Sequence, residues 1–176
     1  MRKIIWLAFI LTIAITGCEG SNSERPLRTK VEIGATAPDF TLRDLQEKNT
    51  SLSEYRGKVV LLTFWKVKCA DCLKTLPSIE AVKERFKDQD LAVLAVNSDN
   101  LEYVKPEKIH GFLKDNRFTF RVVVDETFSA SEAYKIIAIP MTYLIDKKGV
   151  ISYMKFGEED WTSPEGLERI QNLLKG

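Results

Sequence analysis

The fold of this chain is decided by residues 64–72, which read Phe64-Trp65-Lys66-Val67-Lys68-Cys69-Ala70-Asp71-Cys72. They close an apolar run over 59–65, whose β-branched and aromatic residues are typical of a strand buried on both faces. Apolar residues then recur every three or four positions over 70–87, which predicts a helix with one buried face. These apolar positions are Leu73, Leu76, Ile79, Val82 and Phe86. Two cysteines two residues apart therefore lie where a strand gives way to a helix.

The flanking sequence predicts an α/β domain around this unit. A second buried strand is expected over 91–97, and a strand, a helix and a strand in this order favour a parallel crossover. Pro77 is expected to kink the helix, because proline removes a backbone donor. The remaining expected strands are 38–43, 50–52, 120–125, 141–146 and 150–156, and the remaining helices are 107–114, 128–137 and one that begins at Ser163 and Pro164.

Length and composition indicate one ordinary domain. The chain has 176 residues, of which 44% are hydrophobic and 29% charged, enough for a sizeable core. Its 26 basic residues are balanced by 25 acidic ones, and no basic block is present. Nothing in the charge pattern therefore favours a nucleic-acid partner.

The N-terminal residues have the order of a secretory signal. Arg2 and Lys3 precede an apolar run over 4–15, which is too short to span a bilayer comfortably. Residues 15–18, Ile-Thr-Gly-Cys, resemble a bacterial lipobox, after which Cys18 would carry lipid. The chain is thus expected to divide into a lipoprotein signal peptide (1–17), a flexible tether (18–32) and one domain (33–176). A signal peptide with an incidental cysteine and an uncleaved anchor are the alternatives.

Cys69 and Cys72 have the spacing of a redox-active disulfide. A helix that begins near Cys69 directs its free N–H groups and dipole at that sulfur, which favours the thiolate. Lys66 and Lys68 add positive charge nearby, and Asp71 opposes it. Cys72 can reach back from the first helical turn to attack a mixed disulfide at Cys69. Cys69 is therefore the expected attacking thiol, and Cys72 the resolving one.

Two other uses of this pair are less consistent with the sequence. A zinc site needs further ligands, and besides Cys18 only His110 is present, so no metal is expected. His110 itself is expected at the surface or as a satisfied helix residue. A purely structural bridge is also open, although a disulfide that closes so small a loop stabilises a fold little.

Four blocks of sequence together resemble the TlpA/ResA family of membrane-tethered thioredoxin-like proteins, within the AhpC/TSA-Redoxin-like thioredoxin superfamily. The resemblance implies a thioredoxin fold, a central mixed sheet flanked by helices, with an N-terminal β-hairpin and a central helical insertion. It also implies that Pro140 is cis and that the backbone of Ile139 pairs with an extended partner segment. The blocks are 34–42, 51–62, Phe64-Trp65 with the two cysteines, and Ile139-Pro140 followed by 143–149.

The same resemblance implies an exported, lipid-anchored thiol:disulfide oxidoreductase in the cell envelope. Its partners would be protein disulfides or dithiols and a membrane electron donor, with no cofactor and with reduction as the favoured direction. The alternatives are a thioredoxin-fold binding module without efficient exchange and, less favoured, a peroxiredoxin-like peroxidase.

Three positions depart from the pattern of the relatives. Lys68 stands where many have tryptophan, Thr63 where thioredoxins have a buried aspartate, and Thr75 where some cytochrome-maturation members have glutamate. A cytochrome c biogenesis-like role is therefore in doubt. Trp65, Lys68, Asp71 and Thr75 are the positions expected to tune the pair, although Trp65 is equally suited to core packing.

Overall fold

The computed structural model describes residues 30–176. The predicted signal peptide, 1–17, the lipidation site Cys18 and most of the tether, 18–32, lie outside the described residues. Within residues 30–176, no helix has the length and apolar character needed to cross a membrane.

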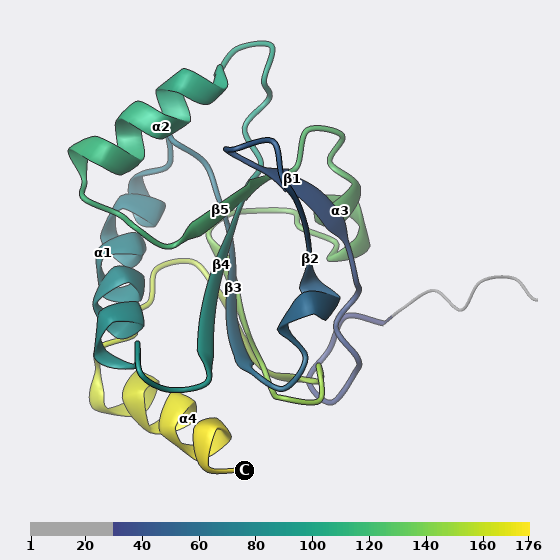
Figure 1. The fold of residues 1–176 in the computed structure, drawn as a ribbon, viewed down its shortest axis with the longest axis vertical. Helices are drawn as coiled ribbons and strands as arrows, with labels where there is room; N and C mark the ends of the chain where they lie inside the picture. Colours follow the sequence, from purple (N-terminus) through teal and green to yellow (C-terminus); the bar gives the residue numbers. More distant parts are fainter. Residues whose placement is uncertain (1–29) are drawn as a thin grey trace, which may run out of the picture.

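One mixed seven-stranded sheet forms the centre of the fold, in the order β2-β1-β5-β4-β3-β6-β7 (Figure 1). Strands β3, β4 and β5 are parallel, and the other neighbours in the sheet are antiparallel. The N-terminal hairpin, β1 and β2, extends one edge of the sheet. The strands are β1 (Thr41–Asp44), β2 (Asn49–Ser51), β3 (Val59–Trp65), β4 (Leu91–Asn97), β5 (Arg121–Val124), β6 (Met141–Ile145) and β7 (Ile151–Phe156).

Helices cover both faces of this sheet (Figure 1). The core cluster on one face includes side chains of α1, α2 and α4, and the cluster on the other face includes side chains of α3 and the short helix η1. Helix α2, between β4 and β5, is the expected central insertion, so the predicted thioredoxin fold is confirmed. The helices are η1 (Leu52–Tyr55), α1 (Ala70–Arg85), α2 (Pro106–Asp115), α3 (Ser129–Ala133) and α4 (Pro164–Lys175).

Strand β3 joins the two halves of the core. Every residue of β3 is buried, as the apolar run predicts. Alternate side chains of a strand point to opposite faces, so Leu61 and Trp65 pack under α1, whereas Leu62 and Phe64 pack on the other side. Burial on both faces therefore fixes the position of the C-terminal end of β3, where the loop that leads to the cysteines begins.

Two expectations about apolar faces are wrong. The helix expected over 128–137 covers only Ser129–Ala133 and is followed by Lys135 in a left-handed conformation, with φ of 52°. The chain turns here because Tyr134 is drawn into the core and donates a hydrogen bond to the carbonyl of Pro38, at 2.8 Å. Ile137 is consequently 98% exposed rather than buried. Leu73, assigned to the buried face of α1, is 46% exposed.

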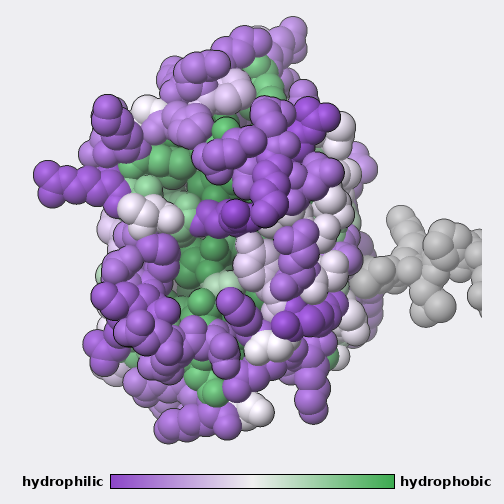
Figure 2. Space-filling model, in the orientation of Figure 1, coloured by the Kyte–Doolittle hydropathy of each residue, from purple (hydrophilic) through white to green (hydrophobic). Residues whose placement is uncertain are grey.

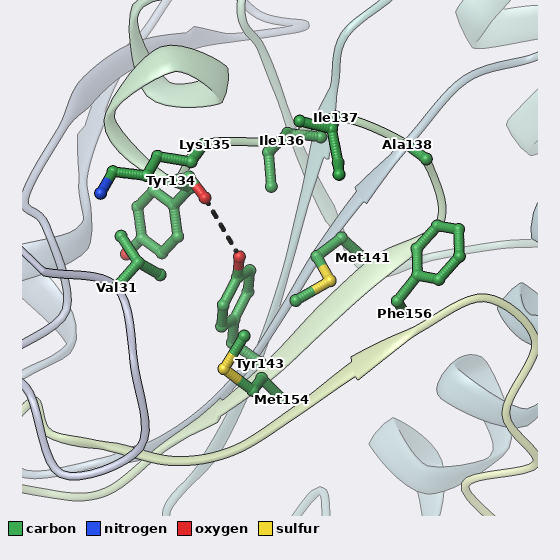
Figure 3. A pocket seen from close by; sticks show the side chains of 10 residues that line it. All are labelled: Val31, Tyr134, Lys135, Ile136, Ile137, Ala138, Met141, Tyr143, Met154 and Phe156. Atoms are coloured by element: carbon green, nitrogen blue, oxygen red, sulfur yellow. Dashed lines mark hydrogen bonds between the residues drawn. The ribbon is translucent and has the colours of Figure 1, made fainter.

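Tyr134 and Tyr143 are buried on the α3 side of the sheet, and each hydroxyl donates to a backbone carbonyl oxygen. The Tyr143 hydroxyl donates to the Tyr134 carbonyl oxygen at 3.3 Å, as the dashed line in Figure 3 marks. Burial raises the pKa of Tyr143 to about 12 and raises the pKa of Tyr134 further. Both phenols therefore stay neutral at ordinary pH.

The last helix is anchored at its N-terminus. Ser163 accepts a hydrogen bond from the Gly166 N–H at 3.1 Å and Pro164 is the first helical residue, as the sequence predicts. Trp161, just before this helix, is fully buried in the cluster that includes α1 and α4. Its backbone N–H donates to Ser78 Oγ of α1 at 3.1 Å. The two helices are thus joined through Trp161.

Candidate redox-active site

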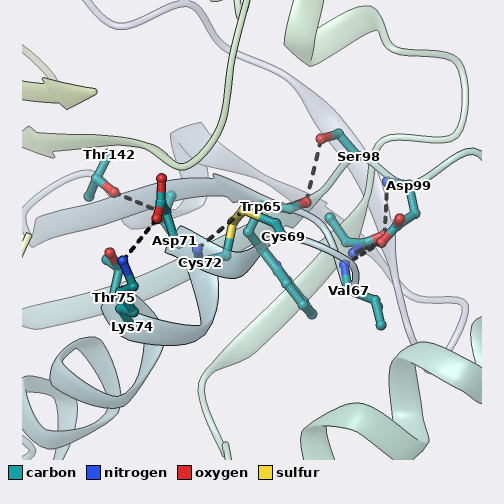
Figure 4. The surroundings of a disulfide bond; sticks show 12 residues. Trp65, Val67, Cys69, Asp71, Cys72, Lys74, Thr75, Ser98, Asp99 and Thr142 are labelled. Atoms are coloured by element: carbon teal, nitrogen blue, oxygen red, sulfur yellow. Dashed lines mark hydrogen bonds and ion pairs between the residues drawn. A yellow bond between two sulfur atoms is a disulfide. The ribbon is translucent and has the colours of Figure 1, made fainter. Parts of the chain in front are cut away.

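The two cysteines form a disulfide at the N-terminus of α1 (Figure 4). Cys69 is the N-cap residue of this helix, and its Sγ accepts a hydrogen bond from the Cys72 N–H at 3.2 Å. Cys72 is fully buried, whereas Cys69 is half-buried. The sulfur that a partner can reach is therefore the one that also receives a helix N–H.

The loop before Cys69 is held by the end of β4. The carbonyl oxygen of Trp65 accepts the N–H of Ser98 at 3.0 Å, and the N–H of Val67 donates to Asp99 Oδ2 at 2.7 Å. Sequence reasoning did not single out Asp99. A signal for it was present, because polar residues at 97–99 directly follow the apolar part of β4.

The Ile139–Pro140 peptide bond is cis, as the resemblance implies. Met141, the first residue of β6, is paired with Phe64 near the end of β3. This register brings Pro140 alongside the chain that leads into Cys69. Pro140 is buried and Ile139 is half-buried between the two core clusters.

The charges around the pair are mostly exposed. Lys74 Nζ lies 3.2 Å from Asp71 Oδ1 and 2.9 Å from Glu158 Oε2, and the hydrogen bond to Glu158 is the main reason that the pKa of Lys74 is raised. Lys68 is exposed, Lys66 is half-buried, and neither forms an ion pair within the described chain. Asp71 therefore has a cation beside it already, whereas the two loop lysines have no carboxylate partner within residues 30–176.

The threonines that replace acidic residues of the relatives are both fully buried. Thr63 shares a hydrogen bond of 2.9 Å with the hydroxyl of Thr142 on the neighbouring strand β6. Thr75 Oγ1 accepts the backbone N–H of Glu159 at 3.2 Å. Both hydroxyls are thus engaged with the protein, and neither position supplies a carboxylate near Cys72.

Two other residues singled out from the sequence make contacts with parts of the chain other than the disulfide. Trp65 is fully buried in the core cluster that also includes Cys72, and its ring is tilted by 31° against that of Phe112 of α2, with ring centroids 5.2 Å apart. His110 is exposed on α2, with Nε2 3.3 Å from the Leu45 carbonyl oxygen. Within residues 30–176, no group of three or more His, Cys, Asp or Glu side chains is placed to hold a metal ion.

An apolar cavity of about 370 Å³ adjoins the cis-proline loop (Figure 3). Residues Tyr134 to Ala138 form one wall, and Met141 and Phe156 lie across from it. Ile137 and Phe156, which is 60% exposed, leave apolar surface at this rim. The face seen in Figure 2 is largely hydrophilic, with apolar side chains visible mainly along a central stripe.

The fold, the Cys-x-x-Cys disulfide at a helix N-terminus and the cis-proline beside it define a thioredoxin-like thiol-disulfide oxidoreductase. The chain belongs to the AhpC/TSA family, whose model matches residues 33–154. It is 35% identical to the thioredoxin-like protein YneN of Bacillus subtilis, over 86% of this chain and 89% of that protein. It is 33% identical to the thiol-disulfide oxidoreductase ResA of Geobacillus kaustophilus, over 99% of this chain and 95% of that protein.

A solved structure has the same fold. It is that of a candidate thiol:disulfide interchange protein DsbE from Chlorobium tepidum, with a TM-score of 0.74 and 26% identity. The match covers 82% of this chain and 99% of that one. The likeness therefore extends over the whole of that protein.

Proposed function

We propose that this protein is an exported, lipid-anchored oxidoreductase that exchanges disulfides with protein substrates through Cys69 and Cys72. One observation carries the proposal: the half-buried sulfur of Cys69 caps a helix, and the sulfur of Cys72 lies buried behind it. A helix N-terminus stabilises a thiolate, which is the reactive form of cysteine. The pair is thus arranged for one outer attacking thiol and one inner resolving thiol.

In the proposed reaction the thiolate of Cys69 attacks one sulfur of a substrate disulfide. A Cys69–substrate disulfide forms, and the other substrate sulfur leaves as a thiolate that takes a proton from water. Cys72 gives its proton to solvent and attacks the Cys69 sulfur, and the second substrate sulfur leaves as a thiolate that takes a proton from solvent. The substrate has gained two electrons and two protons, and the pair has become the Cys69–Cys72 disulfide. A dithiol donor must then reduce the pair again.

Ile139 and Pro140 are proposed to hold the substrate during this exchange. Their position beside the end of β3 leaves the Ile139 backbone next to the segment that precedes Cys69. An extended substrate segment could form backbone hydrogen bonds there, as a strand added to a sheet edge does. The apolar rim formed by Ile137 and Phe156 would contact side chains of the same segment.

Reduction is the proposed direction. The likeness to ResA, a thiol-disulfide oxidoreductase, supports exchange chemistry, and we infer a membrane dithiol protein as the donor of electrons. No cofactor is needed, because the two sulfurs carry the electrons. The proposal does not extend to cytochrome c maturation, since this chain has Thr75 at the place where some cytochrome-maturation members of the family have glutamate.

A trapping experiment tests the roles of the two cysteines. In Cys72→Ser the mixed disulfide on Cys69 has no resolving thiol, so covalent adducts with substrate proteins are expected on non-reducing gels and should disappear with dithiothreitol. The matched control is the double variant, Cys69→Ser with Cys72→Ser, which should trap nothing. If Cys72→Ser traps no partner while the wild type turns over, the assigned roles are wrong.

Lipid attachment at Cys18 is a separate part of the proposal. The structure pairs Cys69 with Cys72, so Cys18 is the third cysteine of the chain and is left for modification. Cys18→Ala is expected to move the protein from the membrane fraction to the soluble fraction and to remove the lipid mass from its N-terminal peptide. Ser21→Ala, three residues further on, should change neither. A Cys18→Ala protein that stays in the membrane would instead favour an uncleaved anchor.

A further inference from the structure

Three consecutive polar residues lie buried where β4 ends beside the redox site. Asn97, Ser98 and Asp99 are 0%, 3% and 5% exposed. Burying a polar or charged side chain is costly unless its hydrogen bonds are replaced inside the protein. Their partners therefore indicate what this cluster is for.

The partners belong to the loop that leads into Cys69. Asp99 Oδ2 accepts a hydrogen bond from the Val67 N–H at 2.7 Å (Figure 4) and a second one from Asn97 Nδ2 at 2.9 Å. The Asp99 N–H donates in turn to Asn97 Oδ1 at 3.2 Å. Asn97 thus fixes the orientation of the Asp99 carboxylate, and the carboxylate fixes Val67. The Val67–Asp99 hydrogen bond ties the loop to the end of β4 through a carboxylate, whereas the bond from the Ser98 N–H to the Trp65 carbonyl oxygen joins two backbone groups.

The position of Val67 matters because Cys69 follows two residues later. Cys69 has an extended backbone, with φ of −135° and ψ of 108°, which an N-cap residue needs if its side chain is to accept a helix N–H. A displaced Val67 would move Cys69 out of this arrangement and away from the Cys72 N–H. The thiolate would then lose part of its stabilisation.

We propose that Asp99 is the positioning residue of the redox site, which holds the 66–68 loop so that Cys69 remains the cap of α1. This inference rests on the proposed exchange function of the pair. Asp99 acts through Val67, with no hydrogen bond to either sulfur in the described structure. A negative charge disfavours a nearby thiolate, so a purely electrostatic role of Asp99 would work against the reaction, whereas the positioning role favours it.

Two substitutions separate position from charge. Asp99→Asn keeps an oxygen that can accept from both Val67 and Asn97 and loses the charge; the other carboxylate oxygen, Oδ1, accepts no hydrogen bond from residues 30–176, so an NH₂ group can replace it. Asp99→Ala loses both the acceptor and the charge. Loss of a hydrogen bond to a charged or strongly oriented acceptor costs on the order of a tenfold change in an equilibrium. Both variants lack the charge, so a difference between them reports the side chain that accepts these hydrogen bonds and not the charge.

The experiment measures the rate of disulfide exchange and the pKa of the Cys69 thiol in both variants. We expect Asp99→Ala to be about tenfold slower than Asp99→Asn, with a higher pKa of Cys69 in the alanine variant. Asp44→Ala is the matched control, because Asp44 is also buried and accepts the N–H groups of Gln46 and Lys48 at 2.9 Å, in the hairpin turn. Its exchange rate should stay within about twofold of the wild type. Equal rates and equal pKa values in Asp99→Ala and Asp99→Asn would overturn the proposal.

Amide hydrogen exchange in the wild-type protein gives a second test, which does not depend on whether a variant folds. The Val67 amide lies in a loop, and its slow exchange with solvent would be due to Asp99, so we expect protection in the wild type and in Asp99→Asn. A Val67 amide that exchanges as fast as in an unstructured peptide would refute the role of Asp99. Absence of disulfide exchange in the wild type would instead refute the proposed function, whereas the amide measurement would still test the contact between Val67 and Asp99.

Discussion

Replacement of Cys69 by serine is expected to lower the rate of insulin reduction at least about a hundredfold, to the rate of the free dithiol, because serine cannot form the mixed disulfide. The fold should survive this change. Serine is a good N-cap residue and can accept the Cys72 N–H, as Cys69 Sγ does at 3.2 Å. A disulfide that closes a loop as short as 69–72 also contributes little to stability. An inactive variant with a wild-type melting temperature is the expected result.

The matched control for Cys69→Ser is Leu73→Ala. Leu73 is close to the pair on α1 and is 46% exposed, so its removal alters the surface near the site and leaves both sulfurs in place. It should keep measurable exchange. A wild-type protein that reduces insulin no faster than free dithiol would favour a binding module, and activity in Cys69→Ser would assign the attack to another group.

Truncation of Trp161 to alanine is expected to cost about 3–5 kcal/mol of the free energy of unfolding, because a fully buried indole leaves a large cavity. Trp161 packs edge-on against Tyr153, with ring centroids 6.0 Å apart, and its backbone joins α1 to the start of α4. Its indole Nε1 has no hydrogen-bond partner among the described residues. Trp161→Phe loses no hydrogen bond and should therefore cost clearly less than Trp161→Ala.

Denaturant unfolding followed by circular dichroism measures both Trp161 variants. Tyr103→Ala is a suitable control, because Tyr103 is 77% exposed and should change stability by no more than about 0.5 kcal/mol. If Trp161→Ala were as stable as the control, the packing between α1 and α4 would not depend on the indole.

The elements whose apolar residues follow a regular pattern could be predicted from the sequence. The run over 59–65 and the periodic apolar residues after Ala70 predicted β3 and α1, because burial of apolar side chains dominates both elements. The segment after Phe128 could not be predicted in this way. Ile136 and Ile137 continue a helical pattern there, but Tyr134 is held in the core by contacts with residues distant in the sequence, such as Pro38, and the helix ends early.

The site could be predicted where it depends on residues that are close together in the sequence. The spacing of Cys69 and Cys72 is visible in the sequence, and the cis state of Pro140 followed from the resemblance. The Asp99 contact was not predictable, because it joins residues 32 positions apart in the chain. Such a contact depends on the parallel pairing of β3 with β4, which places the loop after one strand beside the end of the other.

The hydrogen bonds around Thr75 limit which residues position 75 can accept. The buried hydroxyl oxygen of Thr75 accepts the Glu159 N–H at 3.2 Å, and Ser78, three residues later on α1, donates to the Glu159 carbonyl oxygen at 3.3 Å. A glutamate at position 75 would have to displace this contact and bury its own charge. Threonine and glutamate are thus not freely interchangeable at this position, and a Thr75→Glu variant would need compensating changes in the 158–161 segment.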